Sequence, residues 1–287
     1  MMNETFDRGD AVGASTHAEN FMMDALGQRH APCAGPARIV SLVPSLTELV
    51  CDLGLAGQLV GRTGFCIHPK ATLRSITKVG GTKDVNIVRL RELAPTHVIV
   101  NIDENRRDCV EEIAGFVPHV IVTHPCTPED NVPVYRLLGG IFGCEAEALR
   151  LVGELEAAIA DARALGDNLP REKVLYLIWR EPWMSVARST YISATLARVG
   201  WDTWPPGDEP RYPAFEWNAP WLGDVSRVLL SSEPYSFRDK HLAEVEAASG
   251  RPAALIDGEM ASWYGSRAIQ GLRYMGQFAR ETSGPAR

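Results

Sequence analysis

The sequence predicts an α/β protein of two parallel-sheet lobes joined by one long, rigid α-helix, with a ligand cleft between the lobes. Three observations lead to this fold class. From Arg38 onward, short apolar runs alternate with amphipathic helical stretches, a pattern typical of parallel sheets covered by helices. One helical stretch near the middle of the chain is far longer than the others, and a second α/β series follows it. Loops of two such lobes converge on the space between them, where ligand sites commonly lie.

Composition and charge narrow the function before any motif is considered. Of the 287 residues, 45% are hydrophobic and 23% are charged, which excludes a wholly disordered or collagen-like chain. The 29 lysines and arginines against 36 aspartates and glutamates give a net charge of -7, which argues against a general nucleic-acid binder. No run approaches about 18 apolar residues, so membrane insertion is not expected.

The first 37 residues predict a mobile tail. They lack sustained periodicity and end in Pro32 and Pro36, residues that interrupt regular structure. Their only apolar patch, residues 21–23, is cut off by Asp24, so the segment lacks the apolar core of a secretory signal. Six cysteines without a C-x-x-C pair indicate a reducing compartment rather than a disulfide framework. We therefore expect a cytoplasmic protein.

Residues 38–144 are expected to form the first lobe. The β-branched run at residues 38–43 predicts a strand that Pro44 ends. Ser45 has the spacing of a helix N-cap with Glu48 three residues on, and Gly54 is well placed to end that helix. Further helices are predicted at residues 86–93 and 106–114, and further strands at residues 97–100 and 119–122.

Residues 145–169 are expected to connect the lobes through the long helix. Its apolar side chains recur every three or four residues, at Leu149, Val152, Leu155, Ile159 and Ala162. A helix over residues 145–165 is roughly 30 Å long at about 1.5 Å per residue, and Gly166 and Pro170 end it. Its interior holds no proline and only Gly153 as glycine, so we expect small lobe movements on ligand binding.

Residues 170–287 are expected to form the second lobe. Strands are predicted at residues 174–179, 227–231 and 254–257, and helices at residues 191–199 and 266–280. All seven tryptophans of the chain follow residue 178. Flat aromatic side chains hold a large planar ligand with little loss of entropy. Trp183, Trp217 and Trp263 have charged or turn-forming neighbours and are hard to place in a core. For Trp179 and Trp201, a position in a core strand and a position facing a ligand are equally favoured.

Common catalytic and nucleotide-binding signatures are missing from the sequence. It contains no G-x-S-x-G elbow, no H-E-x-x-H, no phosphate-binding G-x-x-x-x-G-K-[ST] and no strand-anchored G-x-G-x-x-G. Gly80 and Gly81 together indicate a tight turn rather than a phosphate loop.

Two histidine–cysteine pairs are candidate metal ligands. Cys66 and His68 lie two residues apart, and His124 and Cys126 repeat that spacing after a predicted strand. In an extended segment, side chains two residues apart point the same way, and zinc and copper accept such ligands. Neither pair has an evident third and fourth ligand, so a structural role is favoured over direct metal binding.

The order of these motifs resembles the helical-backbone substrate-binding proteins, the Fe/B12 periplasmic-binding (class III, TroA-like) family, over about residues 38–280. The PS-x-TE turn at residues 44–48, the Gly80-Gly81 turn and the strand after Pro95 resemble its first lobe. The long helix, then VLYLIWREPW, YPAFEW and SSEPYSF, follow in the order of its second lobe. The resemblance implies a protein that delivers vitamin B12, haem or ferric siderophores to an ABC importer, and the vitamin B12-binding branch looks nearest.

In that branch the ligand lies edge-on between the lobes, so the resemblance implies site residues on both. On the first lobe these are Pro44, Ser45, Phe65, Cys66, His68, Gly80 and Gly81. On the second lobe these are Trp179, Trp183, Tyr212, Trp217, Tyr235, Trp263 and Tyr264, and Arg267 is a candidate for the polar rim of the ligand. His68 departs from the hydroxyl-rich loop usual at its position, which makes it a candidate ligand for a metal centre.

The leading hypothesis is a cytoplasmic binding protein, without catalysis of its own, for a corrinoid such as cobalamin or for another metal chelate. No covalent cofactor and no nucleic-acid partner are expected. Two alternatives stay open: an enzyme or processing factor that uses Glu181, His68 or Asp103 as acid or base, and an importer subunit whose signal was lost through a misplaced start codon. The missing catalytic signatures disfavour the first alternative, and the missing apolar signal disfavours the second. Corrinoid, haem, siderophore and free metal all remain candidate ligands.

The resemblance also bears on a transporter partner. In the importer-dependent vitamin B12 branch, an exposed glutamate on each lobe pairs with arginines of the permease. Ungapped comparison places these two positions at Val88 and Asn218, which carry no charge. Because such charge pairs steer and orient an encounter, we expect that this protein does not dock on an ABC permease.

Overall fold

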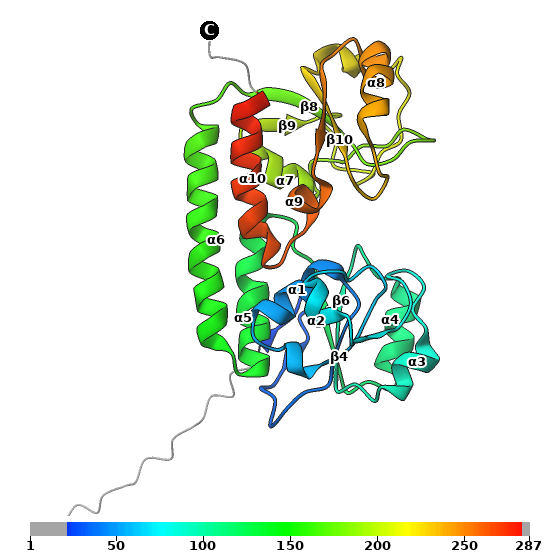
Figure 1. Cartoon of the computed structure of the whole chain (residues 1–287), viewed down its shortest axis with the longest axis vertical. Helices are drawn as coiled ribbons and strands as arrows, with labels where there is room; N and C mark the ends of the chain where they lie inside the picture. The colour runs from blue at the N-terminus through cyan, green and yellow to red at the C-terminus, as the bar shows by residue number, and fades with distance from the viewer. Residues whose placement is uncertain (1–21, 283–287) are drawn as a thin grey trace, which may run out of the picture.

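The structure is a computed structural model that describes residues 22–282 as two α/β lobes beside a column of helices (Figure 1). The first lobe contains five parallel strands in the order β5-β4-β3-β6-β7. The strands are β3 (Ile39–Ser41), β4 (Leu59–Arg62), β5 (Thr77–Lys78), β6 (His97–Asn101) and β7 (His119–Thr123). The helices around them are α1 (Pro44–Asp52), α2 (Lys70–Leu73), α3 (Ile87–Glu92) and α4 (Arg107–Ala114), with a short 3-10 turn, η1 (Ala56–Gln58).

The first-lobe sheet is buried on both faces, as parallel sheets usually are. Along β6, Val98 and Val100 belong to an apolar cluster with Ile113 of α4. Ile99 points to the opposite face and joins the cluster that contains Leu46 of α1. This alternation with a period of two fixes which helices cover each face of the sheet.

The second lobe contains a four-stranded parallel sheet in the order β11-β10-β8-β9. Its strands are β8 (Glu172–Leu177), β9 (Trp201–Thr203), β10 (Arg227–Ser231) and β11 (Ala253–Ile256). Its helices are α7 (Tyr191–Ala197), α8 (Leu242–Ser249) and α9 (Gly258–Ser262), with 3-10 turns η3 (Pro220–Asp224) and η4 (Asp239–His241).

Three helices form a column that runs past both lobes (Figure 1). They are α5 (Asn131–Phe142), preceded by the turn η2 (Pro128–Asp130), α6 (Glu145–Gly166) and α10 (Arg267–Thr282). Gly143 ends α5 in the left-handed conformation, with φ of 66°, and so lets the chain reverse into α6. The hydroxyl of Tyr135 on α5 donates to the carbonyl oxygen of Gly265 (2.8 Å), which ties α5 to the start of α10. One apolar cluster runs through all three helices and into both sheets.

The predicted fold class is confirmed, and most predicted elements appear within one or two residues of the expected ends. The long helix is α6, and the strand expected at residues 227–231 is β10. Several elements were not predicted: β4, β5, β9, α2, α5, α8 and α9. None of the helices within residues 22–282 is both long and apolar enough to cross a bilayer.

The prediction of a mobile tail is wrong for residues 22–37, while residues 1–21 lie outside the described part of the chain. The strands β1 (Met22–Met23) and β2 (Arg29–His30) pair as an antiparallel hairpin. The buried Asp24 carboxylate accepts the backbone N–H of Val122 in β7 (3.1 Å) and contacts His30 Nε2 (3.1 Å). The hairpin is thus anchored by one buried carboxylate, which composition and periodicity do not reveal.

The start of α1 also differs from the prediction. The N-cap is Val43 and the helix begins at Pro44, with no side-chain cap. Proline suits this first helical position because its missing N–H would lack a partner there in any case. Ser45 is therefore inside the helix, and the carboxylate of Glu48 is free to bind elsewhere.

Candidate functional site

The carboxyl ends of the two sheets meet where the lobes touch. Several polar contacts cross this boundary, and three of them join a first-lobe loop or helix to the second lobe or α10 through charged side chains. Arg211 Nη2 donates to Asp103 Oδ2 (2.9 Å), and His68 Nε2 lies 3.0 Å from Glu259 Oε2. Arg267 forms two hydrogen bonds of 2.7 Å to the carboxylate of Glu48. We call the loops that follow β3–β11 at this boundary, with Glu48 and the start of α10, the inter-lobe face.

Several large apolar side chains of these loops are exposed. Phe65 follows β4, Trp179 follows β8, and Tyr212 lies in the loop after β9; their exposed fractions are 64%, 40% and 41%. Ile67 and Ile102, after β4 and β6, are exposed as well. Exposed apolar groups on loops that converge are typical of a binding surface.

Trp263 is the centre of a network that closes one part of the inter-lobe face. The ring of His68 lies edge-on to it, with 5.7 Å between centroids, and the guanidinium of Arg267 lies 5.0 Å from its centroid. Its indole N–H donates to Glu233 Oε1 (2.8 Å). Glu259 Oε2 is 3.4 Å from Arg267 as well as close to His68. The network occupies His68 and Trp263 with partners from the chain itself.

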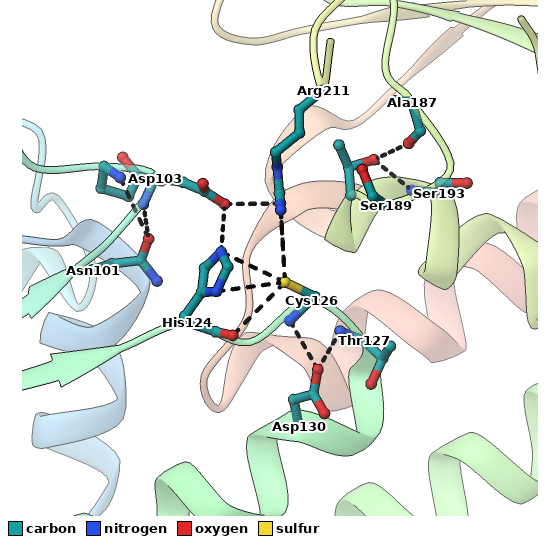
Figure 2. A network of polar contacts seen from close by, with 12 residues as sticks. Asn101, Asp103, His124, Cys126, Thr127, Asp130, Ala187, Ser189, Ser193 and Arg211 are labelled. Carbon is teal, nitrogen blue, oxygen red and sulfur yellow. Dashed lines mark hydrogen bonds and ion pairs between the residues drawn. The ribbon is translucent and has the colours of Figure 1, made fainter. Parts of the chain in front are cut away.

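A second polar cluster lies after β6 and β7, and Figure 2 shows it from close by. His124 Nε2 lies 3.5 Å from Asp103 Oδ2 and 3.6 Å from Cys126 Sγ. Arg211 reaches this cluster from the second lobe and contacts both Asp103 and Cys126. The cluster combines a thiol, an imidazole, a carboxylate and a guanidinium at the lobe boundary.

Two carboxyl groups of the inter-lobe face, those of Glu104 and Glu233, have raised pKa values. Burial raises the pKa of Glu104, with a smaller opposing effect of Lys83. Burial also raises the pKa of Glu233, against the hydrogen bonds from Ser262 and Trp263. Within residues 22–282, neither Glu104 nor Glu233 forms an ion pair. The nearby carboxylates of Glu259 and Glu104 raise the pKa of Glu233 further, because like charges disfavour ionisation.

Comparison with known proteins decides the family. A family model described as "Periplasmic binding protein" matches residues 39–254, which include both sheets up to the first two residues of β11. The chain belongs to this family.

Two curated relatives bear the name vitamin B12-binding protein. The one from Photorhabdus laumondii subsp. laumondii is 28% identical over 100 residues, which is 35% of this chain and 36% of that protein. The one from Pectobacterium carotovorum subsp. carotovorum is 21% identical over 167 residues, 58% of this chain and 60% of that protein. Each match thus spans less than two thirds of the relative's length.

Solved structures match the fold over nearly their whole length. The periplasmic vitamin B12-binding protein BtuF of Vibrio cholerae has a TM-score of 0.73 at 16% identity, covering 86% of this chain and 98% of that one. The periplasmic heme-binding protein RhuT from Roseiflexus sp. RS-1 has a TM-score of 0.74 at 22% identity, covering 87% and 100%. These TM-scores establish the two-lobed fold that the solved structures share, and the low identities leave the ligand open.

In this family member, some predicted site residues do face the lobe boundary. Phe65, Trp179 and Tyr212 are exposed there, and His68 is half-buried. Gly80 has φ of 104°, and a Cβ on it would lie 2.4 Å from the carbonyl oxygen of Asp84, which agrees with the tight turn expected. The binding role of these residues stays a prediction.

Cys66 requires a correction. Its side chain is fully buried, and the hydroxyls of Thr47 and Thr63 lie 3.0 and 3.1 Å from its sulfur. Burial raises the pKa of this thiol. Cys66 therefore packs inside the first lobe and does not share a metal with His68. Within residues 22–282 no group of three or more His, Cys, Asp or Glu side chains is arranged to hold a metal ion.

For Trp183 and Trp217 the expectation that they are hard to place against a core is wrong, because both are half-buried and pack against the second-lobe core; their binding role stays a prediction. Their rings meet edge-on with centroids 5.1 Å apart, and Trp183 stacks on Phe237. Charged neighbours in sequence did not reveal this packing, since the aromatic partners come from distant loops. The remaining predicted residues are placed as follows: Pro44 and Tyr235 half-buried, Ser45, Trp263, Tyr264 and Arg267 buried, and Gly81 beside the ring of Phe65.

Sequence reasoning missed Arg211, Glu233 and Glu259 as parts of the site. Arg211 lies in a proline-rich loop and pairs with a residue 108 positions away. No local spacing signals such a pair. The hollows of about 390 and 380 Å³ found on the surface lie elsewhere, beside α3 and α4 and beside the β1–β2 hairpin.

Proposed function

We propose that this protein binds a metal-chelate ring of the corrinoid class at its inter-lobe face, without catalysis of its own. The charge of that face carries the proposal. Arg211 and Arg267 are both engaged by carboxylates of the chain, whereas Glu104 and Glu233 have no cationic partner within hydrogen-bonding reach in residues 22–282. Carboxylates without an ion-pair partner disfavour the propionates of haem and the anionic groups of ferric siderophores. The neutral carboxamides around a corrin ring instead offer N–H donors to carboxylate oxygens.

The exposed aromatic side chains support the same class of ligand. Phe65, Trp179 and Tyr212 together offer flat apolar area on both lobes, which suits the edge and face of a large ring. The names of two relatives, vitamin B12-binding protein, agree with this choice. Heme-binding proteins share the fold, so haem is the competing ligand.

Thermal unfolding with a set of chelates tests the proposal. The purified protein is heated with hydroxocobalamin, cyanocobalamin, haemin and a ferric catecholate, each in excess. A ligand at 100 times its Kd stabilises the folded state by about 2.7 kcal/mol, so we expect a clear rise in Tm with the cobalamins only. A rise in Tm with haemin or the ferric chelate alone contradicts the proposal. The absence of a rise in Tm with every ring compound contradicts it as well.

We also propose that the protein works without an ABC permease and resides in the cytoplasm. Val88 on α3 is 70% exposed and Asn218 is exposed, so both positions are accessible yet uncharged. Cells that express the gene from its native start are fractionated, and the protein is expected in the cytosol. Recovery from the periplasm, or co-purification with a permease, contradicts this proposal and leaves the choice of ligand untouched.

A further inference from the structure

Tyr264 brings a buried hydroxyl without a partner to the inter-lobe face. Only 7% of the residue is exposed, and its ring meets that of Tyr191 edge-on, with 5.8 Å between centroids. The hydroxyl oxygen forms no hydrogen bond within residues 22–282; the Ser45 side chain lies near it but outside hydrogen-bonding geometry. A buried polar group without a partner costs free energy in the folded state. Packing of the free protein therefore does not explain this hydroxyl.

The charged neighbours of this hydroxyl come from the loops of the inter-lobe face. Burial raises the pKa of Tyr264, and the carboxylates of Glu104 and Asp103 raise it further. Asp103 is already paired with Arg211 (2.9 Å), whereas Glu104 forms no ion pair within the described part of the chain. Tyr212 is another neighbour of the hydroxyl and is 41% exposed, so the buried hydroxyl lies close to the open surface.

Glu233 adds a carboxylate that the second lobe holds in one orientation. Trp263 Nε1 and Ser262 Oγ donate to its Oε1, at 2.8 and 2.9 Å. A Cβ on Gly258 would lie 2.5 Å from Glu233 Cγ, so this glycine lets α9 pack closely against the stem of the glutamate. Glu233 is half-buried, and its Oε2 has no partner within residues 22–282. One carboxylate oxygen is thus fixed by the protein, and the other is available to accept a hydrogen bond.

A primary carboxamide matches this set of groups. It carries two N–H donors and one carbonyl acceptor, whereas the face offers carboxylate acceptors at Glu104 and Glu233 and a hydroxyl donor at Tyr264. A metal ion does not match, because no group of three His, Cys, Asp or Glu side chains within residues 22–282 is arranged to hold one. A carboxylate of the ligand does not match either, because it would add a third negative charge beside two that lack ion-pair partners.

We propose that Glu104, Glu233 and Tyr264 recognise carboxamide groups of the bound ring and reject the corresponding carboxylic acids. The two carboxylates accept hydrogen bonds from amide N–H groups, and the Tyr264 hydroxyl donates to an amide carbonyl oxygen. The inference rests on the proposed function, because it requires a corrinoid at the inter-lobe face. It goes further in naming the residues that distinguish an amidated ring from its acid.

Removal of the Tyr264 hydroxyl tests the donor. Because this hydroxyl has no partner in the free protein, Tyr264→Phe is expected to keep or raise Tm and to weaken cyanocobalamin binding about three- to tenfold. Tyr191→Phe is the matched control. The Tyr191 hydroxyl accepts a hydrogen bond from Asn131 Nδ2 (3.2 Å), so this variant is expected to lower Tm and to keep the wild-type affinity. A Tyr264→Phe variant that binds cyanocobalamin like the wild type overturns the inference.

Hydrolysed cobalamins test the two carboxylates. In the monocarboxylic acids of cyanocobalamin, propionate replaces one of the three propionamide side chains, and each isomer is titrated at pH 8 beside cyanocobalamin. The wild-type protein is expected to bind at least one isomer about tenfold or more weakly than cyanocobalamin. In the double variant Glu104→Gln/Glu233→Gln this penalty is expected to disappear, because glutamine offers N–H donors to the ligand carboxylate. Glu156→Gln, at an exposed position of α6, is the control and keeps the wild-type penalty.

The outcomes separate this inference from the proposed function. If cyanocobalamin binds and every acid isomer binds equally well, the inference is overturned and the proposed function stands. The same holds if the penalty persists in the double variant. If cyanocobalamin does not bind the wild-type protein, the proposed function fails and the inference fails with it.

Discussion

At Trp263, the ring that was expected to face a ligand is held by three groups of the protein. His68 meets its edge, Arg267 covers it and Glu233 accepts its N–H, so only 9% of the residue is exposed. Trp179 is 40% exposed and has Tyr235 edge-on beside it. The two tryptophans thus have different roles. Trp263 joins the lobes, whereas Trp179 is available for binding.

Alanine at each of these positions should separate the two roles. Trp263→Ala removes a buried ring and is expected to destabilise the free protein by about 3–5 kcal/mol. Trp179→Ala is expected to change stability by less than about 1 kcal/mol and to weaken cobalamin binding at least about tenfold. Thermal unfolding and a cobalamin titration measure the two effects. Unchanged binding by Trp179→Ala would show that this ring takes no part in the site.

Glu233 provides a test of the buried negative charge. Because its pKa is raised in the folded state, its ionised form costs stability above the unfolded pKa, and the cost disappears as pH falls through the folded pKa. Glutamine keeps the Oε1 acceptor for Ser262 and Trp263 but removes the charge. We expect Glu233→Gln to raise Tm by about 1–3 °C at pH 8 and to lose this advantage near pH 4.

The exposed Glu216 supplies the control for that experiment. Glu216→Gln removes the same charge where no ion pair or burial is involved, so its Tm should follow the wild type at both pH values. A Glu233→Gln variant that melts below the wild type at pH 8 would refute the argument from burial.

Among the elements, those with a strong internal period could be predicted from the sequence. The helix α6 shows such a period, and the strand β10 is a short buried apolar run; both have nearly the predicted ends. The helix α5 was missed because Pro133 and the pair Gly139-Gly140 are usually read as interruptions. In the structure these glycines allow close approach: a Cβ on Gly139 would lie 2.6 Å from Ala148, and one on Gly140 would lie 2.8 Å from Met22.

The exposure of Phe65 and Tyr212 agrees with their loop positions in the sequence, while their binding role stays a prediction. Contacts between residues distant in sequence could not be predicted. The pairs Arg267–Glu48 and Arg211–Asp103 are 219 and 108 residues apart, and only the fold brings them together. The burial of Cys66 likewise depends on Thr47 from a different element.

The two glycines of the helical column should respond oppositely to alanine. Gly139→Ala is expected to cost about 1–3 kcal/mol, because the added methyl group forces α5 and α6 apart. Gly153→Ala lies on α6 with open space around it and is expected to stabilise the protein by up to about 1 kcal/mol. Urea unfolding of both variants measures the difference. Equal effects would mean that the contact between α5 and α6 adapts freely.

At the scale of the whole molecule, the helical column restricts how the lobes move. The helix α6 passes both lobes without a break, with α5 beside its first half and α10 beside its second (Figure 1). Hinge motion requires a few residues that absorb changes of φ and ψ, and a continuous helix packed along its length offers none. The lobes are therefore expected to keep nearly the same arrangement with and without ligand.

Small-angle scattering measures this expectation directly. Curves of the free and the cobalamin-loaded protein should coincide apart from small differences at wide angle. Arg267→Ala, which removes the contact with Glu48 across the boundary, should still give a free-state curve close to the wild type if the column dominates. A marked change of the radius of gyration on loading would contradict a rigid column.

The apolar cluster that runs from the first sheet through the column into the second sheet bears on how such proteins can be recombined. A fragment made by cutting the chain at either end of α6 would expose a broad apolar surface to solvent. Neither lobe is therefore an independent folding unit. The exposed side chains of the inter-lobe face, such as Phe65, Trp179 and Tyr212, lie outside that shared interior. Exchange of specificity between relatives is therefore best sought by grafting the loops that carry them onto an intact frame, rather than by swapping lobes.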